Sequence, residues 1–183
     1  MGGVMAATFD KLVEAIHYVC SKAGNEPERL DQIKLNKILW YSDAKAYMTS
    51  GQPITGVRYI KKPFGPVPSY NRVAVETLEG RGVLRRGQAV SGTGSWNTHF
   101  DVIEDYEPNV LHETERGIID DVYSVIVEGH TSMSISESSH GGVWMLADND
   151  EELPLYTVFA EKLGAISDAH MELAREGLPR EGL

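Results

Sequence analysis

The stretch from Leu30 to Met48, LDQIKLNKILWYSDAKAYM, constrains the fold more than any other part of this sequence. Asp31 is suited to begin a helix, because its carboxylate can accept hydrogen bonds from the free backbone N–H groups of the first turn. Gly51 is suited to end it, since glycine readily adopts the left-handed conformation found at helix C-termini. The sequence therefore predicts one helix over about residues 31–49.

Apolar residues occupy two adjacent rows of this predicted helix. The first row holds Ile33, Ile38, Tyr41, Ala44 and Met48, and the second holds Leu35, Leu39 and Ala46. Two rows are too wide for a helix that packs on one neighbour, so we expect a central helix with Leu39 and Tyr41 nearly buried. Its polar face consists of Lys34, Asn36, Lys37, Ser42, Asp43 and Lys45. We expect the function to come from this face or from the loops around it.

Helical spacing of apolar residues predicts further helices on both sides of the central one. Their expected ranges are 8–23, 69–80, 111–128, 131–139 and 155–176. Thr8 and Ser69 are suited to cap the first two of these helices. The helix over 111–128 has an apolar face made of Ile118, Ile119, Val122, Val125 and Ile126.

The strand signals are fewer. Residues 83–90 and 98–104 are separated by a glycine-rich connection, which predicts a β-hairpin over about 83–104, and Val57 to Ile60 suggests a short extra strand. The stretch Phe64–Pro68 is predicted to be irregular, because its two prolines lack N–H donors and fix φ. We expect this bend to lie against the central helix, near Lys34 and Lys37.

These elements predict a mainly α, α+β fold: a compact helical domain around the central helix, with one hairpin and a short extra strand. At 183 residues the chain is long enough for a substantial core. It shows no internal repeat and no linker, so we expect a single domain over 1–183. Its single cysteine, Cys20, fits a reducing cytoplasm, and without an apolar run long enough to span a bilayer we expect no membrane association.

Charge is distributed unevenly along the chain. Residues 1–100 contain 13 Lys and Arg against 8 Asp and Glu, whereas residues 101–183 contain 4 against 19. The acidic half could be an ordinary solvated surface, or it could steer a basic partner through its long-range field. Helix–helix–hairpin order is also typical of a winged helix, with Arg85 and Arg86 on the wing. Nucleic-acid binding is nevertheless disfavoured, because a duplex would repel the acidic half.

Catalytic motifs are absent from the sequence, including HExxH, GxSxG, CxxC and a phosphate-binding loop. The best isolated candidate is His140, which with Ser136 or Ser139 and the nearby Glu137 could form a small hydrolytic set. The alternative is a histidine that stabilises a turn and packs near Trp144. No grouping of metal ligands is convincing, so we expect no metal and no cofactor.

Three sequence blocks resemble the Panacea domain family, which includes the SocA-type antitoxins. The blocks are Lys34–Asp43 (KLNKILWYSD), Gly51–Pro68 with its GQPI, Tyr59 and FGPVP, and Ile135–His140 (ISESSH) followed by Trp144 and Pro154. Their order and spacing make the resemblance specific over about residues 30–160. Trp40, Ser42 and Phe64 depart mildly from the residues usual in the family.

The resemblance implies an antitoxin that neutralises a protein toxin by direct binding, and not an enzyme. SocA-type members also act as adaptors that deliver the toxin to an AAA+ protease, and phage-encoded members make a mobile-element origin one expectation. The resemblance also implies structural roles for Leu35, Asn36, Leu39, Tyr41, Gly65, Pro66, Pro68, Ser136, Ser139, His140 and Trp144. The candidate partner contacts are Lys34, Lys37, Asp43, Tyr59, Phe64 and Val67. The toxin, the mechanism of neutralisation and the oligomeric state stay open.

Overall fold

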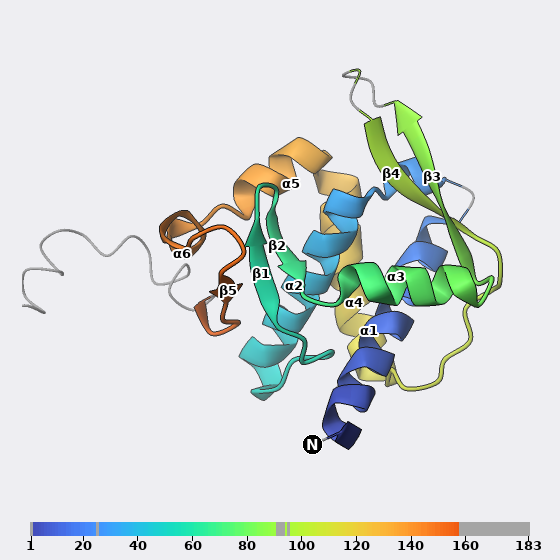
Figure 1. The fold of residues 1–183 in the computed structure, drawn as a ribbon, viewed down its shortest axis with the longest axis horizontal. Coiled ribbons are helices and arrows are strands. Elements are labelled where there is room, and N and C mark those ends of the chain that lie inside the picture. The colour runs from blue at the N-terminus through green and yellow to red at the C-terminus, as the bar shows by residue number, and fades with distance from the viewer. Residues whose placement is uncertain (1, 25, 91–93, 95, 158–183) are drawn as a thin grey trace, which may run out of the picture.

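The central element of the fold is α2, Gln32–Ser50, which the other elements surround (Figure 1). The computed structural model describes residues 2–24, 26–90, 94 and 96–157. The Asp31 carboxylate accepts a hydrogen bond from the Lys34 backbone N–H at 2.9 Å, and Gly51 ends the helix with φ at 76°. Both predicted capping residues are thus confirmed. Leu35, Ile38 and Leu39 lie in the core, as expected of a central helix.

The other elements follow in an order that confirms a mainly α, α+β fold. They are α1 (Gly2–Ala23), η1 (Pro27–Arg29), β1 (Tyr59–Lys62), β2 (Gly65–Pro68), α3 (Asn71–Gly80), β3 (Leu84–Val90), β4 (Trp96–Val102), α4 (Glu113–Gly129), α5 (Ser132–Ser138), α6 (Gly142–Leu146) and β5 (Glu152–Leu153). The predicted helix over 155–176 lies almost entirely outside the described residues. Within them, no helix combines the length and apolar character needed to cross a bilayer.

The helix α1 begins earlier than the sequence predicted. It starts at Gly2, so Thr8 lies inside the helix and does not cap it. Its apolar residues, including Leu12 and Ile16, are buried against the rest of the core. The thiol of Cys20 is also buried, and this burial raises its pKa.

The prediction that Phe64–Pro68 is irregular was wrong. Residues 65–68 form β2, which pairs antiparallel with β1 in a three-stranded sheet of order β2–β1–β5. The register joins Ile60 to Val67 and Tyr59 to Pro68. Because β2 is an edge strand, Pro66 and Pro68 can be accommodated without breaking pairing on both sides.

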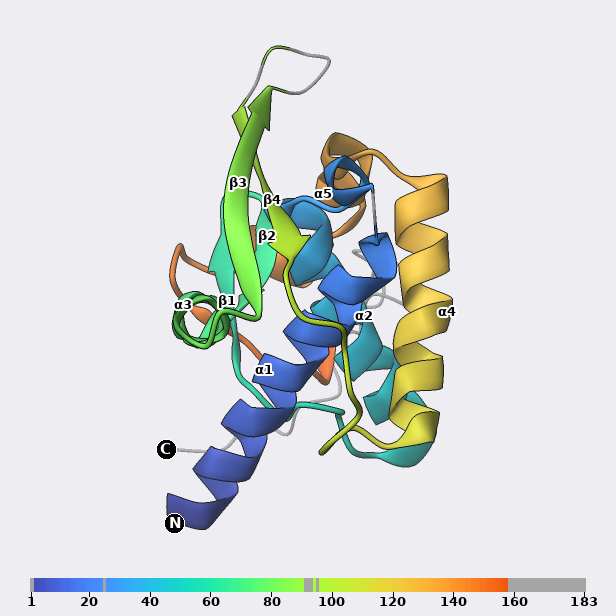
Figure 2. The same cartoon turned by 90° about the vertical axis from the view of Figure 1, so that its right-hand side faces the viewer.

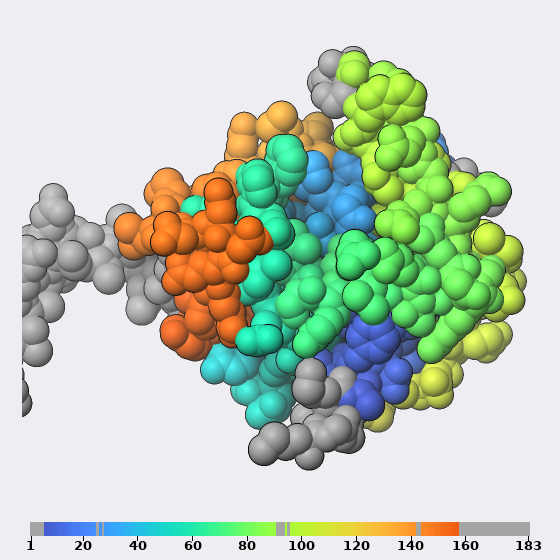
Figure 3. All heavy atoms as spheres, viewed as in Figure 1, coloured from blue at the N-terminus to red at the C-terminus, as the bar shows by residue number. Residues whose placement is uncertain are grey.

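The hairpin β3–β4 confirms the strand pair predicted over about 83–104. It projects beyond the helices, whereas α4 runs alongside α2 as an outer helix (Figure 2). β5 pairs with β1 on the side away from β2, and the orange segment that contains α6 and β5 covers that side of the molecule (Figure 3). The predicted cap at Ser69 was wrong, since α3 starts at Asn71 after Tyr70.

The polar face predicted for α2 is largely buried, which corrects the sequence interpretation. Its buried members are Asn36, Lys37, Ser42 and Asp43. They are buried because β2 and α5 pack against α2 in addition to α4 and α1, and Tyr59 of β1 reaches Asp43. Conversely, Tyr41 is only partly buried, although it belongs to an apolar row and was expected in the core.

Candidate functional site

The three sequence blocks meet around the Lys37 side chain. Lys37 extends from α2 toward Gly65 of β2, and Ser139 reaches the same place from the end of α5. Gly65 has φ at 100°, and a Cβ there would lie 2.9 Å from Cε of Lys37 and closer still to its Nζ and to Oγ of Ser139. Only glycine permits both this conformation and this close approach. The predicted position of the bend near Lys37 is therefore confirmed.

Lys37 is a buried lysine. Its exposed fraction is 1%, and none of the described residues forms an ion pair with it. Burial lowers the pKa of Lys37 to about 7, because a low-dielectric environment disfavours the ammonium form. A lysine that is partly neutral near pH 7 could accept a proton, in this case beside the Ser139 hydroxyl.

His140 and Trp144 extend this cluster. Their rings stack with centroids 3.7 Å apart and an angle of 8° between planes, which confirms their predicted packing. Lys61 Nζ lies 4.2 Å from the Trp144 ring centroid and donates to the Ala147 carbonyl at 2.8 Å. Burial, followed by the charges of Lys37 and Lys61, lowers the pKa of His140. We call Lys37, Gly65, Ser139, His140 and Trp144 the Lys37 cluster.

The serines proposed for a hydrolytic set are poorly placed for attack on a substrate. Ser136 and Ser139 are buried, and Ser139 Oγ donates to the Ser136 carbonyl at 2.7 Å. Among the described residues, no hydrogen bond joins the His140 ring to either serine; its Nε2 is buried without a partner. The backbone N–H of His140 does bond within its turn, to Glu137 O at 3.0 Å. Nucleophilic catalysis needs a base within hydrogen-bond reach of an accessible nucleophile, and neither serine is accessible in this arrangement.

Asp43 anchors the loop that follows α2. Its carboxylate accepts hydrogen bonds from the Thr55 backbone N–H at 2.8 Å, the Thr55 hydroxyl at 2.5 Å and the Tyr59 hydroxyl at 2.8 Å. Burial raises the pKa of Asp43, and the three hydrogen bonds oppose that rise. Asp43 therefore ties α2 to β1 from the inside of the protein.

These positions correct half of the predicted partner contacts. Lys37, Asp43 and Tyr59 are each 1% exposed, so a partner cannot touch their side chains in this structure. They are buried because the β1–β2 hairpin covers α2. Phe64, at the tip of that hairpin, is 57% exposed. Lys34 and Val67 are partly exposed.

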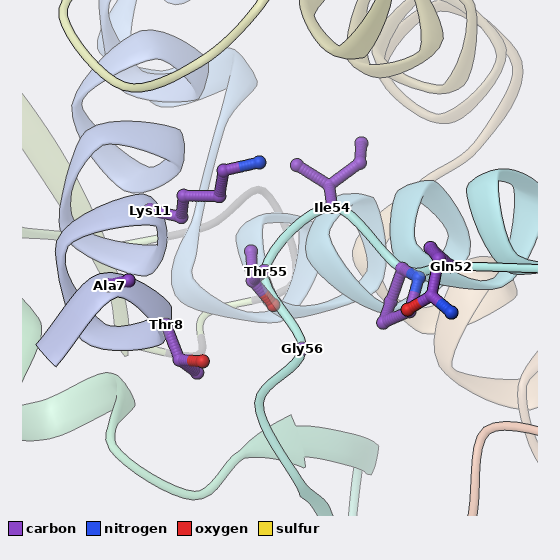
Figure 4. Close-up of a pocket in the computed structure, with 8 residues that line it drawn as sticks. Ala7, Thr8, Lys11, Gln52, Ile54, Thr55 and Gly56 are labelled. Atoms are coloured by element: carbon purple, nitrogen blue, oxygen red, sulfur yellow. The ribbon is translucent and has the colours of Figure 1, made fainter. Parts of the chain in front are cut away.

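Among the cavities on the surface of the described part of the chain, two are considered for binding. The smaller, of about 360 Å³, lies between α1 and the loop after α2, where Ala7, Thr8 and Lys11 face Gln52 to Gly56 (Figure 4). The larger, of about 940 Å³, runs between α2, α4 and α5, and we call it the α2–α4 groove. Its lining is Tyr41, Ala44, Lys45, Met48, Thr49, Asp121, Val122, Val125, Ile126, His130, Ile135 and Ser138.

Sequence reasoning did not identify the groove as a site. The signal was present in Tyr41, Met48 and Val125, which belong to predicted apolar faces but line the groove. Periodicity shows which residues avoid water, and it does not show whether the chain itself covers them. In the described part of the chain, no group of three or more potential metal ligands comes together.

Comparison with known proteins places the fold in a family. The model of the antitoxin SocA-like, Panacea domain matches residues 35–145, a range that includes α2, the β1–β2 hairpin and the Lys37 cluster. No curated protein and no solved structure matched the chain. Because the matched range covers more than half of the 183 residues, this chain belongs to the family of antitoxin SocA-like proteins with a Panacea domain.

Proposed function

We propose that this protein is the antitoxin of a toxin–antitoxin system and neutralises a protein toxin by direct binding. The observation that carries the proposal is its membership of the SocA-like Panacea family. The toxin is expected to be encoded beside the antitoxin. Its identity does not follow from the family, because the resemblance describes Panacea domains that are paired with many unrelated toxins.

The geometry supports binding over catalysis. The motif residues are used to hold the protein together: Leu35 and Leu39 form the core, while Asn36 accepts a hydrogen bond from Asn71 Nδ2 at 3.0 Å. Ser136 and Ser139 are buried at the end of α5. With its motif side chains committed to internal contacts, the protein presents surface shape and charge to a partner.

Three of the predicted contacts stay available for that partner. Phe64 is a large apolar side chain at an exposed hairpin tip, with Lys34 and Val67 partly exposed. We propose that Phe64 contributes an apolar anchor, since buried aromatic residues often carry much of the binding energy of an interface. The acidic half of the chain would raise the association rate with a basic toxin, an effect that salt weakens.

Direct inhibition and proteolytic delivery give different results in the cell. Under direct inhibition, the toxin accumulates in an inactive complex, so its level stays constant while growth recovers. An adaptor would lower the toxin level, and deleting the AAA+ protease would abolish rescue. We propose direct inhibition, and rescue that persists at constant toxin level in the protease-deficient strain is the expected result.

Co-expression tests the proposal as a whole. Each reading frame adjacent to this gene is expressed alone and together with the antitoxin, and growth is followed alongside a pull-down. We expect one neighbour to arrest growth alone, to lose that effect with the antitoxin, and to be retained by it. If no neighbour is toxic and none is retained, the antitoxin function is wrong for this chain.

A further inference from the structure

The residues that line the α2–α4 groove come from one face of α2 and one face of α4, and they are not scattered along the chain. From α2 come Tyr41, Ala44 and Met48, with Lys45 and Thr49 beside them, at the spacing of one helix face. From α4 come Asp121, Val122, Val125 and Ile126, and Ile135 and Ser138 of α5 close one end. The α2 stripe is about 12 Å long, which corresponds to a little over two helical turns.

The groove contains apolar residues that the sequence pattern assigns to a buried face. Val125 belongs to the apolar face of α4, yet it is 64% exposed. Tyr41 and Met48 belong to an apolar row of α2 and are only partly buried. All three line this one groove. The apolar faces of α2 and α4 therefore include residues that no other described part of the chain fully covers.

Two helices with a furrow between their side-chain ridges accept a third helix by ridge-into-groove packing. Peptide recognition uses the same geometry when an amphipathic helix places its apolar row in a hydrophobic groove. The floor of this groove, with Ala44 between Tyr41 and Met48, has a small residue at its centre. A ligand helix could approach closely there.

The charges along the α4 edge indicate which charged residues the polar face of such a helix should carry. Asp121 is exposed and binds Lys45, with Oδ2 and Nζ 2.7 Å apart. Glu128 lies seven residues further along α4, on the same stripe as Asp121 and Val125, and is exposed without an ion pair among the described residues. His130 also lines the groove, where its Nδ1 lies 3.2 Å from Ser134 Oγ. Lys45 is paired with Asp121 in the groove, and Glu128 adds a negative charge to α4 just outside the residues that line it.

We propose that the α2–α4 groove binds an amphipathic helix of the toxin, with its apolar row between Tyr41, Met48 and Val125 and its lysines or arginines along the α4 edge. This proposal rests on the proposed antitoxin function and names the surface and the kind of segment recognised. A basic residue of the toxin helix then meets Glu128, and the apolar row buries Val125.

The first test uses a matched pair of surface variants and the toxin found by co-expression. Val125→Lys places a cation at the groove, and Val73→Lys makes the same change at a 43% exposed valine of α3. We expect Val125→Lys to weaken toxin binding by about tenfold or more, and Val73→Lys to leave the dissociation constant unchanged. Glu128→Lys should slow association and reduce its dependence on salt. Normal toxin binding by Val125→Lys overturns the groove and leaves the antitoxin function intact.

A second test works even if no neighbouring toxin is found. The probe is a synthetic helical peptide with leucines on one face and lysines on the other, titrated into the full-length protein while methyl NMR signals are recorded. We expect the signals of Met48, Val122, Val125 and Ile126 to shift, and Val125→Lys to remove these shifts. Shifts of the same size in Val125→Lys, or none in the native protein, contradict the proposal.

The proposal would also be overturned if the α2–α4 groove were occupied by a second copy of the chain or by the final segment of the chain. A second copy of the chain would give a dimer by sedimentation equilibrium that Val125→Lys converts to a monomer. The final segment of the chain itself would be identified by Phe159→Asp in the full-length protein, if that change raises the peptide affinity about tenfold. We expect neither result.

Discussion

The Lys37 cluster and the α2–α4 groove have the opposite burial from the one that their sequences indicate. The cluster is built around polar side chains, and it is closed by β1, β2 and the end of α5. The groove is built from apolar rows, and it is open. The two regions adjoin at α5, where Ser138 lines the groove and Ser139 belongs to the cluster.

The contrast assigns different tasks to the two regions. In the cluster, Lys37 and Ser139 both approach Gly65 so closely that no side chain fits there, which restricts how β2 and α5 can pack on α2. The side chains of an open apolar groove contribute little to the stability of the fold. Their exposed apolar area can instead be buried by a partner. Stability should therefore respond to changes in the cluster, and binding should respond to changes in the groove.

The largest effect is expected for Gly65→Val. The variant combines a left-handed backbone with a collision against Lys37 and Ser139, so we expect the free energy of unfolding to fall by about 2–6 kcal/mol. Urea denaturation measures it. Gly82→Val is the control, because Gly82 also has a positive φ, 75°, but open space around it. Equal losses in the two variants would show that the approach to Lys37 does not matter.

The next effect is a pH dependence that Lys37 creates. Its pKa is about 7 in the folded protein, below the value of an exposed lysine, so between these two values the unfolded chain binds more protons. Stability should therefore rise with pH from about 7 to 10, by about 1.4 kcal/mol per unit from this group. Lys37→Met should remove that increment and be more stable than the native protein at pH 7. Parallel pH profiles would mean that Lys37 is solvated.

A smaller effect is expected for His140→Ala, which removes the ring stacked on Trp144. We expect a loss of about 0.5–1.5 kcal/mol, measured as a lower thermal midpoint, and recovery in His140→Phe, which keeps an aromatic ring. Because burial lowers the pKa of His140, its neutral form is favoured in the folded state, and stability should fall as the pH drops below about 6.5. Loss of a hydrolytic turnover at unchanged stability would instead indicate an enzyme.

The smallest effect on stability is expected in the groove. Val125→Lys changes an exposed side chain and should alter the free energy of unfolding by no more than about 0.5 kcal/mol. The same variant is the one expected to weaken toxin binding by about tenfold or more. If it destabilises the protein by several kcal/mol, Val125 is part of the folded core, and the groove is not a free surface.

The framework of the fold was predictable because local chemistry decides it. Asp31 and Gly51 cap α2 as expected, Thr131 caps α5, and the glycine-rich connection joins β3 to β4. The start of α1 was missed because the cap signal at Thr8 did not stop the helix. The strand β2 was missed because proline was taken to exclude regular structure, whereas an edge strand accommodates it.

The site was less predictable because burial is set by neighbours far away in the sequence. Lys37, Asp43 and Tyr59 were expected on the surface, but Lys37 and Asp43 lie under the β1–β2 hairpin, and Tyr59 of that hairpin bonds to Asp43 in the interior. Spacing along α2 cannot show that a later hairpin folds back over its polar face. For the same reason, the sequence assigned Val125 to the core although α2 and α5 leave it open.

In this account the toxin binds the α2–α4 groove, and the Lys37 cluster contributes only to the stability of the fold. Hydrogen–deuterium exchange of the full-length protein, free and in complex with its co-encoded toxin, tests this claim most directly. We predict that the toxin slows exchange most strongly in α4 from Asp121 to His130 and in the second half of α2. Slowing confined to β1 and β2, with the exchange of α4 unchanged, would contradict the account.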